Sequence, residues 1–359
     1  MSLHVTPAAA PNRQIDSLQI LRAVAALFVF VFHYFGALQH DFGLFESNPF
    51  PLGAFGVDIF FVVSGFIICF ASQNETSAGG FFLKRICRIV PLYWLLTLGV
   101  FAIALIAPSL LNSTTADWGN LLKSLAFIPY QKENGLLQPI LYLGWTLNYE
   151  MFFYLIFALS IYSGRYRIWI CMSVIAGLVL LGVIFKPESD IGRFYTSGVM
   201  LNFVWGCIVY LIWYNAPALI ERLTWLWPLG AGLLILQNFL QLPIAREFAY
   251  GLPSMLLLLG LLTVRLPQGS VWQFVKELGD ASYSLYLVHP YIIQVVIKIV
   301  LPLLGITALS ITVSSVVVLA LTLIVSLLLF RLFEKPSNLY LRNMLLKQRV
   351  PLLAPQTGK

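Results

Sequence analysis

Residues 21–35 read LRAVAALFVFVFHYF, a stretch in which almost every side chain is apolar. Two residues depart from the pattern, Arg22 near its start and His33 near its end. An apolar run that extends to about 20 residues is long enough to cross the hydrocarbon core of a bilayer as a helix. The stretch therefore predicts a membrane-spanning helix that carries two basic side chains.

The composition of the whole chain agrees with this prediction. Of its 359 residues, 59% are apolar and only 10% are charged. A soluble globular domain contains about 45–50% apolar and about 25% charged residues. We therefore predict an all-α polytopic membrane protein and exclude a soluble globular fold.

About ten segments are long and apolar enough to span a bilayer. They lie near residues 17–38, 53–71, 90–110, 144–163, 166–185, 194–214, 222–241, 247–265, 282–303 and 307–331. The segment near 247–265 is the weakest of the ten. An even number of spans places both termini on the same side of the membrane.

The distribution of lysine and arginine predicts which side that is. With the N-terminus in the cytoplasm, most of the 22 basic residues fall in inner segments, and Lys298 lies within a span. Basic segments stay in the cytoplasm, so we predict that both termini lie there. We expect one transmembrane domain, residues 1–337, and a basic cytoplasmic tail, residues 338–359. The net charge of +7 needs no nucleic-acid partner to explain it, and we see no nucleic-acid motif.

Arg22 and His33 share one face of the first predicted helix. They are eleven residues apart, which is almost three helical turns and about 16 Å along the axis. Ala25, Ala26 and Val29 lie on the same strip, and small residues allow another helix to approach closely. We expect this face to point into the bundle, with Arg22 near the cytoplasmic end and His33 in the outer half.

Two acidic residues have a similar predicted depth. Asp58 lies about five residues from the outer end of its span, as His33 does, and Glu150 lies several residues in from the outer side. An acid beside an imidazole fixes the tautomer of the ring and makes its other nitrogen a better base. We predict a polar cavity shared by His33, Asp58 and Glu150. The alternatives are a structural His33–Asp58 pair and a packing hydrogen bond from Glu150 to Tyr154 or a neighbouring helix.

The predicted inner loop at 81–94 reads FFLKRICRIVPLYW. Arg85 and Arg88 are three residues apart, on one face of a short helix that we expect to end before Pro91. A guanidinium matches the geometry of phosphate oxygens, so the pair suits a phosphate-bearing ligand. Basic residues beside a span can equally bind lipid headgroups or set topology. His289, just before a proline, either lines the inner half of a cavity or packs at a helix kink.

Six stretches together resemble the membrane-bound acyltransferase-3 family. They are Arg22-x10-His33, GVDIFFVVSGF at 56–66, KRICRIVPLYW at 84–94, WTLNYEMFFYL at 145–155, SYSLYLVHP at 282–290 and FEKP at 333–336. Their order and spacing over residues 15–337 make the match specific. Thr146 stands where many relatives have serine.

The resemblance implies a ten-helix enzyme of the bacterial plasma (inner) membrane. Such an enzyme moves an acyl group, usually acetyl, from cytoplasmic acyl-CoA to a hydroxyl of a lipid-linked or exported glycan. The resemblance also implies that His33 is essential and that Arg85 and Arg88 take part in the acyl-CoA step. The compact chain looks most like exopolysaccharide acetyltransferases. The implied partners are acyl-CoA, a glycan or lipid-linked saccharide acceptor and membrane lipids.

We therefore predict catalytic roles for His33, Asp58 and Glu150, and binding of the co-substrate acetyl-CoA by Arg22, Arg85, Arg88 and His289. No cluster of metal ligands is present, so we predict no metal. His33 either removes the proton from the sugar hydroxyl or is itself acylated first, and the sequence leaves both routes open. Two alternatives remain: a proton-coupled transporter or flippase with His33, Asp58 and Glu150 as a proton relay, and a catalytically silent scaffold.

Overall fold

The computed structural model describes residues 16–111, 114–264, 267 and 269–346, and these fold almost entirely into helices. The long helices are α1 (Asp16–Phe42), α2 (Gly56–Ala71), α3 (Ala78–Ile106), α5 (Trp145–Ser160), α6 (Arg167–Phe185), α8 (Leu201–Asn215), α10 (Leu226–Leu240), α11 (Leu252–Leu261), α13 (Ser282–Val295) and α15 (Ala308–Leu329). Shorter helices are α4 (Trp118–Leu125), α7 (Asp190–Tyr195), α9 (Pro217–Ile220), α12 (Ser270–Asp280), α14 (Leu301–Leu304) and α16 (Lys335–Leu346).

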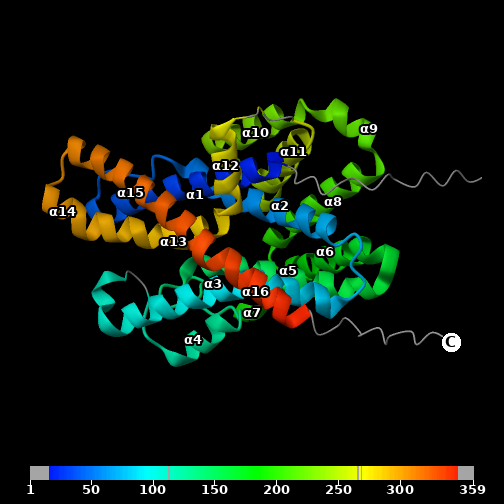
Figure 1. Ribbon diagram of the computed structural model, residues 1–359, viewed down its shortest axis with the longest axis horizontal. Coiled ribbons are helices and arrows are strands. Elements are labelled where there is room, and N and C mark those ends of the chain that lie inside the picture. The colour runs from blue at the N-terminus through cyan, green and yellow to red at the C-terminus, as the bar shows by residue number, and fades with distance from the viewer. Residues whose placement is uncertain (1–15, 112–113, 265–266, 268, 347–359) are drawn as a thin grey trace, which may run out of the picture.

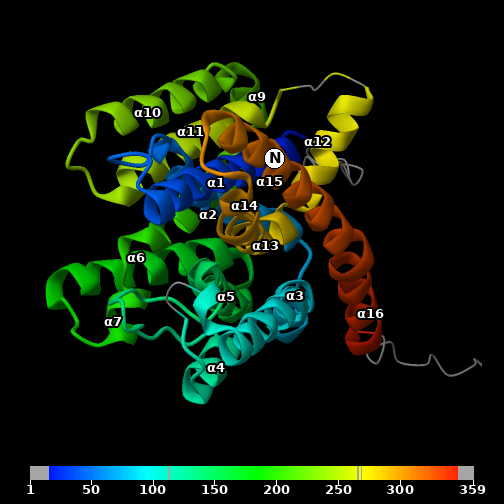
Figure 2. The same cartoon turned by 90° about the vertical axis from the view of Figure 1, so that its left-hand side faces the viewer.

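The helices form two groups with α13 between them. Figure 2 shows α3, α5, α6 and α7 on one side and α1, α2, α10 and α11 on the other. The first residues of α1 and the last of α16 both lie in the right-hand half of Figure 1. This arrangement leaves the centre of the bundle to side chains from α1, α2, α3, α5 and α13.

Seven helical segments of the described chain are long and apolar enough to cross a membrane, and an eighth joins them if the bent pair Pro217–Leu223 and Leu226–Leu240 is one span. One of the seven, Tyr142–Phe185, has 44 residues and covers two of the predicted spans. The chain bends inside it at Gly164, whose φ is 56°. The weakest prediction corresponds to the shorter apolar helix Glu247–Leu261. The multi-pass helical architecture is confirmed, whereas the number ten stays a prediction.

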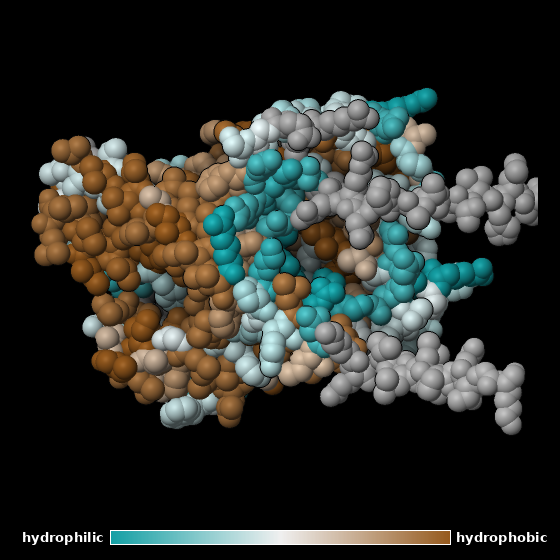
Figure 3. All heavy atoms as spheres, in the orientation of Figure 1, coloured by the Kyte–Doolittle hydropathy of each residue, from teal (hydrophilic) through white to brown (hydrophobic). Residues whose placement is uncertain are grey.

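The surface is that of a membrane protein. Brown, apolar side chains cover most of the left and centre of Figure 3, while hydrophilic side chains gather around α12 and toward the right-hand end. Large apolar side chains such as Leu180 of α6 and Val316 of α15 are 59% and 64% exposed. Contiguous apolar surface of this extent marks contact with lipid.

Several boundaries differ from the sequence predictions, and α3 begins at Ala78, twelve residues before the span predicted near 90–110. α1 continues to Phe42, about one turn beyond its predicted end. α3 is one continuous helix with Pro91 inside it, so our prediction of a short helix that ends before Pro91 is wrong. Neighbouring helices in a membrane bundle tolerate the missing N–H of a proline. The predicted domain boundary at 337/338 falls inside α16, and the rest of the predicted tail lies outside the described residues.

Glycines let the central helices approach one another closely. A Cβ added to Gly65 of α2 would lie 2.2 Å from the Phe203 carbonyl oxygen, and one added to Gly206 of α8 would lie 2.0 Å from the Val62 carbonyl oxygen. Two backbones this close leave no room for a side chain. The α2–α8 crossing is therefore fixed by the absence of Cβ atoms, as in other membrane helix pairs.

We expect Gly206→Ala to destabilise the protein by about 1–3 kcal/mol, because the new methyl group must push α2 and α8 apart. The measurement is the apparent thermal unfolding midpoint of detergent-purified protein. Gly177→Ala in α6 is the matched control, because nothing lies within 4 Å of its added Cβ. Equal midpoints for the two variants would show that the crossing does not depend on Gly206.

Candidate active site

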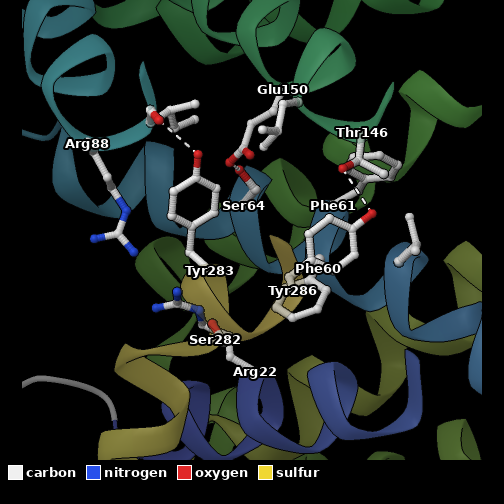
Figure 4. Close-up of a pocket in the computed structure, with 13 residues that line it drawn as sticks. Arg22, Phe60, Phe61, Ser64, Arg88, Thr146, Glu150, Ser282, Tyr283 and Tyr286 are labelled. Atoms are coloured by element: carbon white, nitrogen blue, oxygen red, sulfur yellow. Dashed lines mark hydrogen bonds between the residues drawn. The ribbon is translucent and has the colours of Figure 1, made fainter. Parts of the chain in front are cut away.

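A pocket between α1, α2, α3, α5 and α13 lies at the centre of the bundle, and we call it the Arg22 pocket. Its volume is about 90 Å³. Its polar lining consists of Arg22, Ser64, Arg88, Thr146, Glu150, Ser282, Tyr283 and Tyr286 (Figure 4). The pocket therefore combines two guanidinium groups with a carboxylate and several hydroxyl groups.

The two arginines lie on one side of this pocket. Figure 4 shows the guanidinium groups of Arg22 and Arg88 on the same side of Tyr283, with Glu150 across the ring from Arg88. Tyr283 is held in place because its hydroxyl donates to the Ile89 carbonyl at 2.8 Å. Arg22 donates to the side chain of Gln19 at 3.0 Å. Together the two guanidiniums provide a cationic surface suited to phosphate oxygens.

Arg85 does not line the pocket, although we predicted it to act beside Arg88. Its guanidinium carbon lies over the Phe81 ring, 5.6 Å from the ring centroid. Its Nε is buried and has no hydrogen-bond partner within the described residues. The structure therefore separates the surroundings of Arg85 from those of Arg88, and the role of Arg85 in binding acyl-CoA stays a prediction.

Glu150 is held by hydroxyl groups. Ser64 Oγ donates to Glu150 Oε1 at 3.0 Å, and the Tyr154 hydroxyl donates to the same oxygen. The hydrogen bond with Tyr154 was one of our sequence alternatives, and it is present. Ser64, which the sequence alone did not mark as a site residue, fixes the carboxylate on the wall of the Arg22 pocket.

A second pocket lies farther along α1, and we call it the His33 pocket. Its volume is about 290 Å³. Its polar lining consists of His33, His40, Thr114, Asn134, Gln138, Tyr142, Tyr291 and Gln294. The amide groups of Gln138 and Gln294 make no hydrogen bond to another described residue. This pocket therefore offers free amide donors and acceptors beside aromatic rings.

His33 contacts a second histidine. His33 Nδ1 lies 3.0 Å from His289 Nε2, and the ring centroids are 5.1 Å apart. His289 is fully buried, and its Nδ1 lies 3.0 Å from the Leu285 carbonyl oxygen. The sequence left two alternatives for His289, the inner half of a cavity and packing at a helix kink. The structure shows a buried side chain beside Pro290 that lines neither pocket and contacts His33.

Tyr286 lies between the Arg22 pocket and His289. It lines the Arg22 pocket, and its ring centroid lies 6.2 Å from that of His289. Thr146 Oγ1 donates to the Leu143 carbonyl at 3.0 Å and lies 3.1 Å from the Tyr286 hydroxyl oxygen, within hydrogen-bond distance. This small group of side chains forms the partition between the Arg22 pocket and the His33–His289 pair.

The structure does not bring the three predicted catalytic residues together, and the predicted His33–Asp58 pair is wrong. Asp58 is fully buried and accepts hydrogen bonds from Arg246 Nη2 at 2.8 Å, Arg246 Nε at 3.1 Å and Asn202 Nδ2 at 2.8 Å. It lines neither pocket. Glu150 lies in the Arg22 pocket and His33 in the other, so the shared cavity that we predicted is absent from the described residues.

The register of α1 against α2 explains the difference. A Cβ added to Gly56 would lie 2.6 Å from the Ala25 carbonyl, so the start of α2 packs against the middle of α1. His33 lies eight residues beyond Ala25, which is about 12 Å along the axis. Asp58 is two residues from Gly56, about 200° around the helix, and therefore faces away from α1.

Two charged groups outside the candidate spans lie near the pockets. Burial lowers the pKa of Lys132 to about 8, and its ammonium donates to Thr114 Oγ1, on the wall of the His33 pocket, at 3.2 Å. Burial raises the pKa of Asp280, while the charges of Arg22 and Arg88 act in the opposite direction. Each pocket is thus bordered by a partly desolvated charge.

The sequence predicts no site role for several of these residues. It places Arg246 in an outer loop and indicates no function for Asn202 or Glu334. Glu334 belongs to the FEKP stretch, and its buried carboxylate accepts from Ser284 Oγ at 2.6 Å. A polar residue inside an apolar helix is a signal that could have flagged Asn202, but its partner comes from a distant part of the chain.

No group of three or more His, Cys, Asp and Glu side chains within the described residues is arranged to hold a metal ion. The four cysteines are buried and free. The arrangement that remains is an integral membrane protein with two polar pockets and an imidazole pair between them.

Comparison with known proteins identifies the class to which this arrangement belongs. The model of a family described as an acyltransferase domain matches residues 15–331. The chain belongs to this acyltransferase-3 family, and the resemblance seen in the sequence is confirmed.

Three curated relatives extend the comparison. The exopolysaccharide production protein ExoZ of Rhizobium meliloti (strain 1021) is 35% identical over 260 residues, covering 70% of this chain and 80% of that protein. The acyltransferase MdmB of Streptomyces mycarofaciens is 28% identical over 54% of this chain and 52% of its own. The putative peptidoglycan O-acetyltransferase YrhL of Bacillus subtilis (strain 168) is 26% identical over 56% of this chain and 34% of its own. No solved structure matches the chain.

We expect Arg246→Met to lower the apparent unfolding midpoint strongly, because it leaves the Asp58 carboxylate buried without its partner. Breaking a fully buried ion pair costs about 3–5 kcal/mol, and we expect a smaller loss here because the Arg246 side chain is 40% exposed. The double variant Asp58→Asn with Arg246→Met should recover much of this loss, because it buries no isolated charge. The measurement is thermal unfolding of both variants in the same detergent. A double variant as unstable as the single one would contradict the pairing.

Proposed function

We propose that this protein is an O-acyltransferase that moves an acyl group, acetyl in the first instance, from acyl-CoA to a hydroxyl of a glycan. Its family supports acyl transfer, and the names of two relatives refer to exopolysaccharide production and to peptidoglycan O-acetylation. The observation that carries the proposal is the presence of two different pockets on either side of the His33–His289 contact.

The Arg22 pocket suits the donor. The guanidiniums of Arg22 and Arg88 bind CoA phosphates at the pocket entrance, because a guanidinium pairs well with phosphate oxygens. Glu150, on the pocket wall, accepts a hydrogen bond from an amide N–H of the pantetheine arm. The thioester reaches His33 when Tyr286 moves off Thr146, since their hydrogen bond separates the pockets.

The His33 pocket suits the acceptor. Gln138 and Gln294 carry amide groups that can donate to and accept from sugar hydroxyls, and Tyr142 and Tyr291 offer ring faces beside them. Such a combination of apolar rings and a few polar groups is typical of small-molecule sites. The acceptor is a glycan unit, lipid-linked or exported, whose hydroxyl comes next to the free edge of the His33 ring.

The reaction is then a displacement at the thioester carbonyl. His33 removes the proton from the sugar hydroxyl while its oxygen attacks the carbonyl carbon. The C–S bond breaks, the new C–O bond forms the ester, and CoA leaves as a thiolate that takes up the proton. The alternative is a relay in which the acyl group first passes to His33 and then to the sugar.

The membrane sets the direction of this transfer. With ten spans and both termini in the cytoplasm, as the basic residues indicate, Arg22 lies toward the cytoplasm and His33 toward the outer face. Acyl-CoA is then taken from the cytoplasm and the glycan is acylated at the outer side of the bacterial plasma (inner) membrane. This arrangement explains why the two pockets lie at different depths along α1.

We expect His33→Ala to lower transfer of radiolabel from acetyl-CoA to glycan acceptors at least about 100-fold, as loss of a general base does. The assay uses purified protein in nanodiscs and a panel of lipid-linked and soluble glycans. His4→Ala, outside the described residues, is the matched histidine control. Label retained on the wild-type protein without acceptor, and lost in His33→Ala, would favour the acyl-histidine relay. Equal transfer by both variants would exclude His33 as the catalytic group.

We expect Arg88→Ala to raise KM for acetyl-CoA roughly tenfold or more, because a hydrogen bond to a charged group contributes about 1.5–3 kcal/mol. S-acetylpantetheine lacks the nucleotide phosphates, so the variant and the wild type should have similar KM values for this donor. Arg165→Ala is the matched arginine control, because Arg165 is exposed, lines neither pocket and donates a hydrogen bond to the adjacent Tyr166. An equal rise in KM for both donors would show that Arg88 does not act by binding the CoA phosphates.

A further inference from the structure

The hydrogen bonds around His289 determine where its proton lies. Its Nδ1 is 3.0 Å from the Leu285 carbonyl oxygen, one helical turn earlier. A carbonyl oxygen can only accept, so Nδ1 carries the hydrogen. Pro290, the next residue, has no N–H to give the helix, and this leaves the turn around His289 less tightly bonded.

His289 is neutral in this position. Its side chain is fully buried, and within the described residues no carboxylate forms a hydrogen bond or ion pair with either His33 or His289. An isolated charge in such apolar surroundings is costly. A neutral imidazole with its hydrogen on Nδ1 has a lone pair on Nε2, so His289 presents an acceptor to His33.

The same reasoning then applies to His33. Its Nδ1 lies 3.0 Å from the His289 Nε2 lone pair, so His33 Nδ1 carries the hydrogen and donates it. The remaining nitrogen, His33 Nε2, is left with a lone pair. His33 lines the His33 pocket whereas His289 does not, so the His289 contact lies behind the pocket wall.

We propose that His289 is a positioning residue that holds His33 in the tautomer with a free Nε2, through the chain Leu285 carbonyl, His289 and His33. The proposal rests on the transfer reaction proposed above, in which His33 is the general base, and it identifies His289 as the residue that fixes the tautomer of that base. In a serine protease triad a carboxylate has this task, and loss of the correct tautomer there lowers kcat by about 10⁴. In this chain an uncharged imidazole replaces the carboxylate.

The imidazole pair also spreads the positive charge that forms on His33 during the reaction. When His33 Nε2 takes the proton from the sugar hydroxyl, the proton on its Nδ1 can pass to His289 Nε2. The positive charge is then shared between two rings, and His289 still donates to Leu285. The number of protons is unchanged by this shift. A site of this kind needs no buried carboxylate beside the base, and this agrees with the finding that Asp58 pairs with Arg246 instead.

The first test compares two replacements of His289 in nanodiscs. In His289→Gln the side-chain oxygen can still accept from His33 Nδ1, whereas in His289→Leu nothing can. We expect His289→Leu to lower kcat at least about 100-fold with KM for acetyl-CoA nearly unchanged, and His289→Gln to restore most of the rate. In a His33→Ala background, His289→Leu should cause no further loss. Equal rates for the Gln and Leu variants, both folded, would overturn the proposal.

The second test does not depend on activity. Solid-state ¹⁵N NMR of histidine-labelled protein in lipid bilayers reports which ring nitrogen is protonated, and the chain has only four histidines to assign. We expect the wild-type His33 to be protonated at Nδ1 alone and to become a mixture of tautomers in His289→Leu. A wild-type His33 protonated at Nε2 would overturn the proposal even if acyl transfer is observed. If no acyl transfer is detected, the proposed function is wrong, but the NMR spectra still show which nitrogen of His33 is protonated.

Discussion

The interior of a bilayer offers no water to a charged side chain, so a carboxylate in a span is stabilised by partners within the protein. This constraint accounts for the surroundings of Asp58 and Glu150. Asp58 is buried against Arg246 and Asn202, and Glu150, which is half-buried, accepts hydrogen bonds from Ser64 and Tyr154. Each carboxylate is thereby tied to one place, and neither is free to move toward His33.

Close helix packing decides where those partners meet. Gly65 and Gly206 bring the backbones of α2 and α8 into direct contact, and Gly56 brings the start of α2 against Ala25 of α1. These contacts fix both the rotation and the depth of α2. As a result, Asp58 faces away from α1, and His33 meets α13 instead. The site is therefore a consequence of the same small residues that stabilise the bundle.

An imidazole pair is well suited to base chemistry in such surroundings. A carboxylate next to His33 would be strongly desolvated unless a cation accompanied it. A neutral His289 avoids that cost and still accepts a hydrogen bond, because its own proton is bonded to the Leu285 carbonyl. The donor and acceptor pockets can then lie on different sides of the pair without a charged group in the partition between them.

The sequence by itself determined that the chain is a multi-pass helical membrane protein and that it resembles the acyltransferase-3 family. It also identified Arg22, His33, Arg88 and Glu150 as residues that line polar pockets. These features depend on composition and on the repeat within single helices, which are local properties. The partners of His33 and Asp58 lie 256 and 188 residues away in His289 and Arg246. Only the tertiary structure decided those pairings, because rotation and depth of one helix against another depend on packing between distant segments.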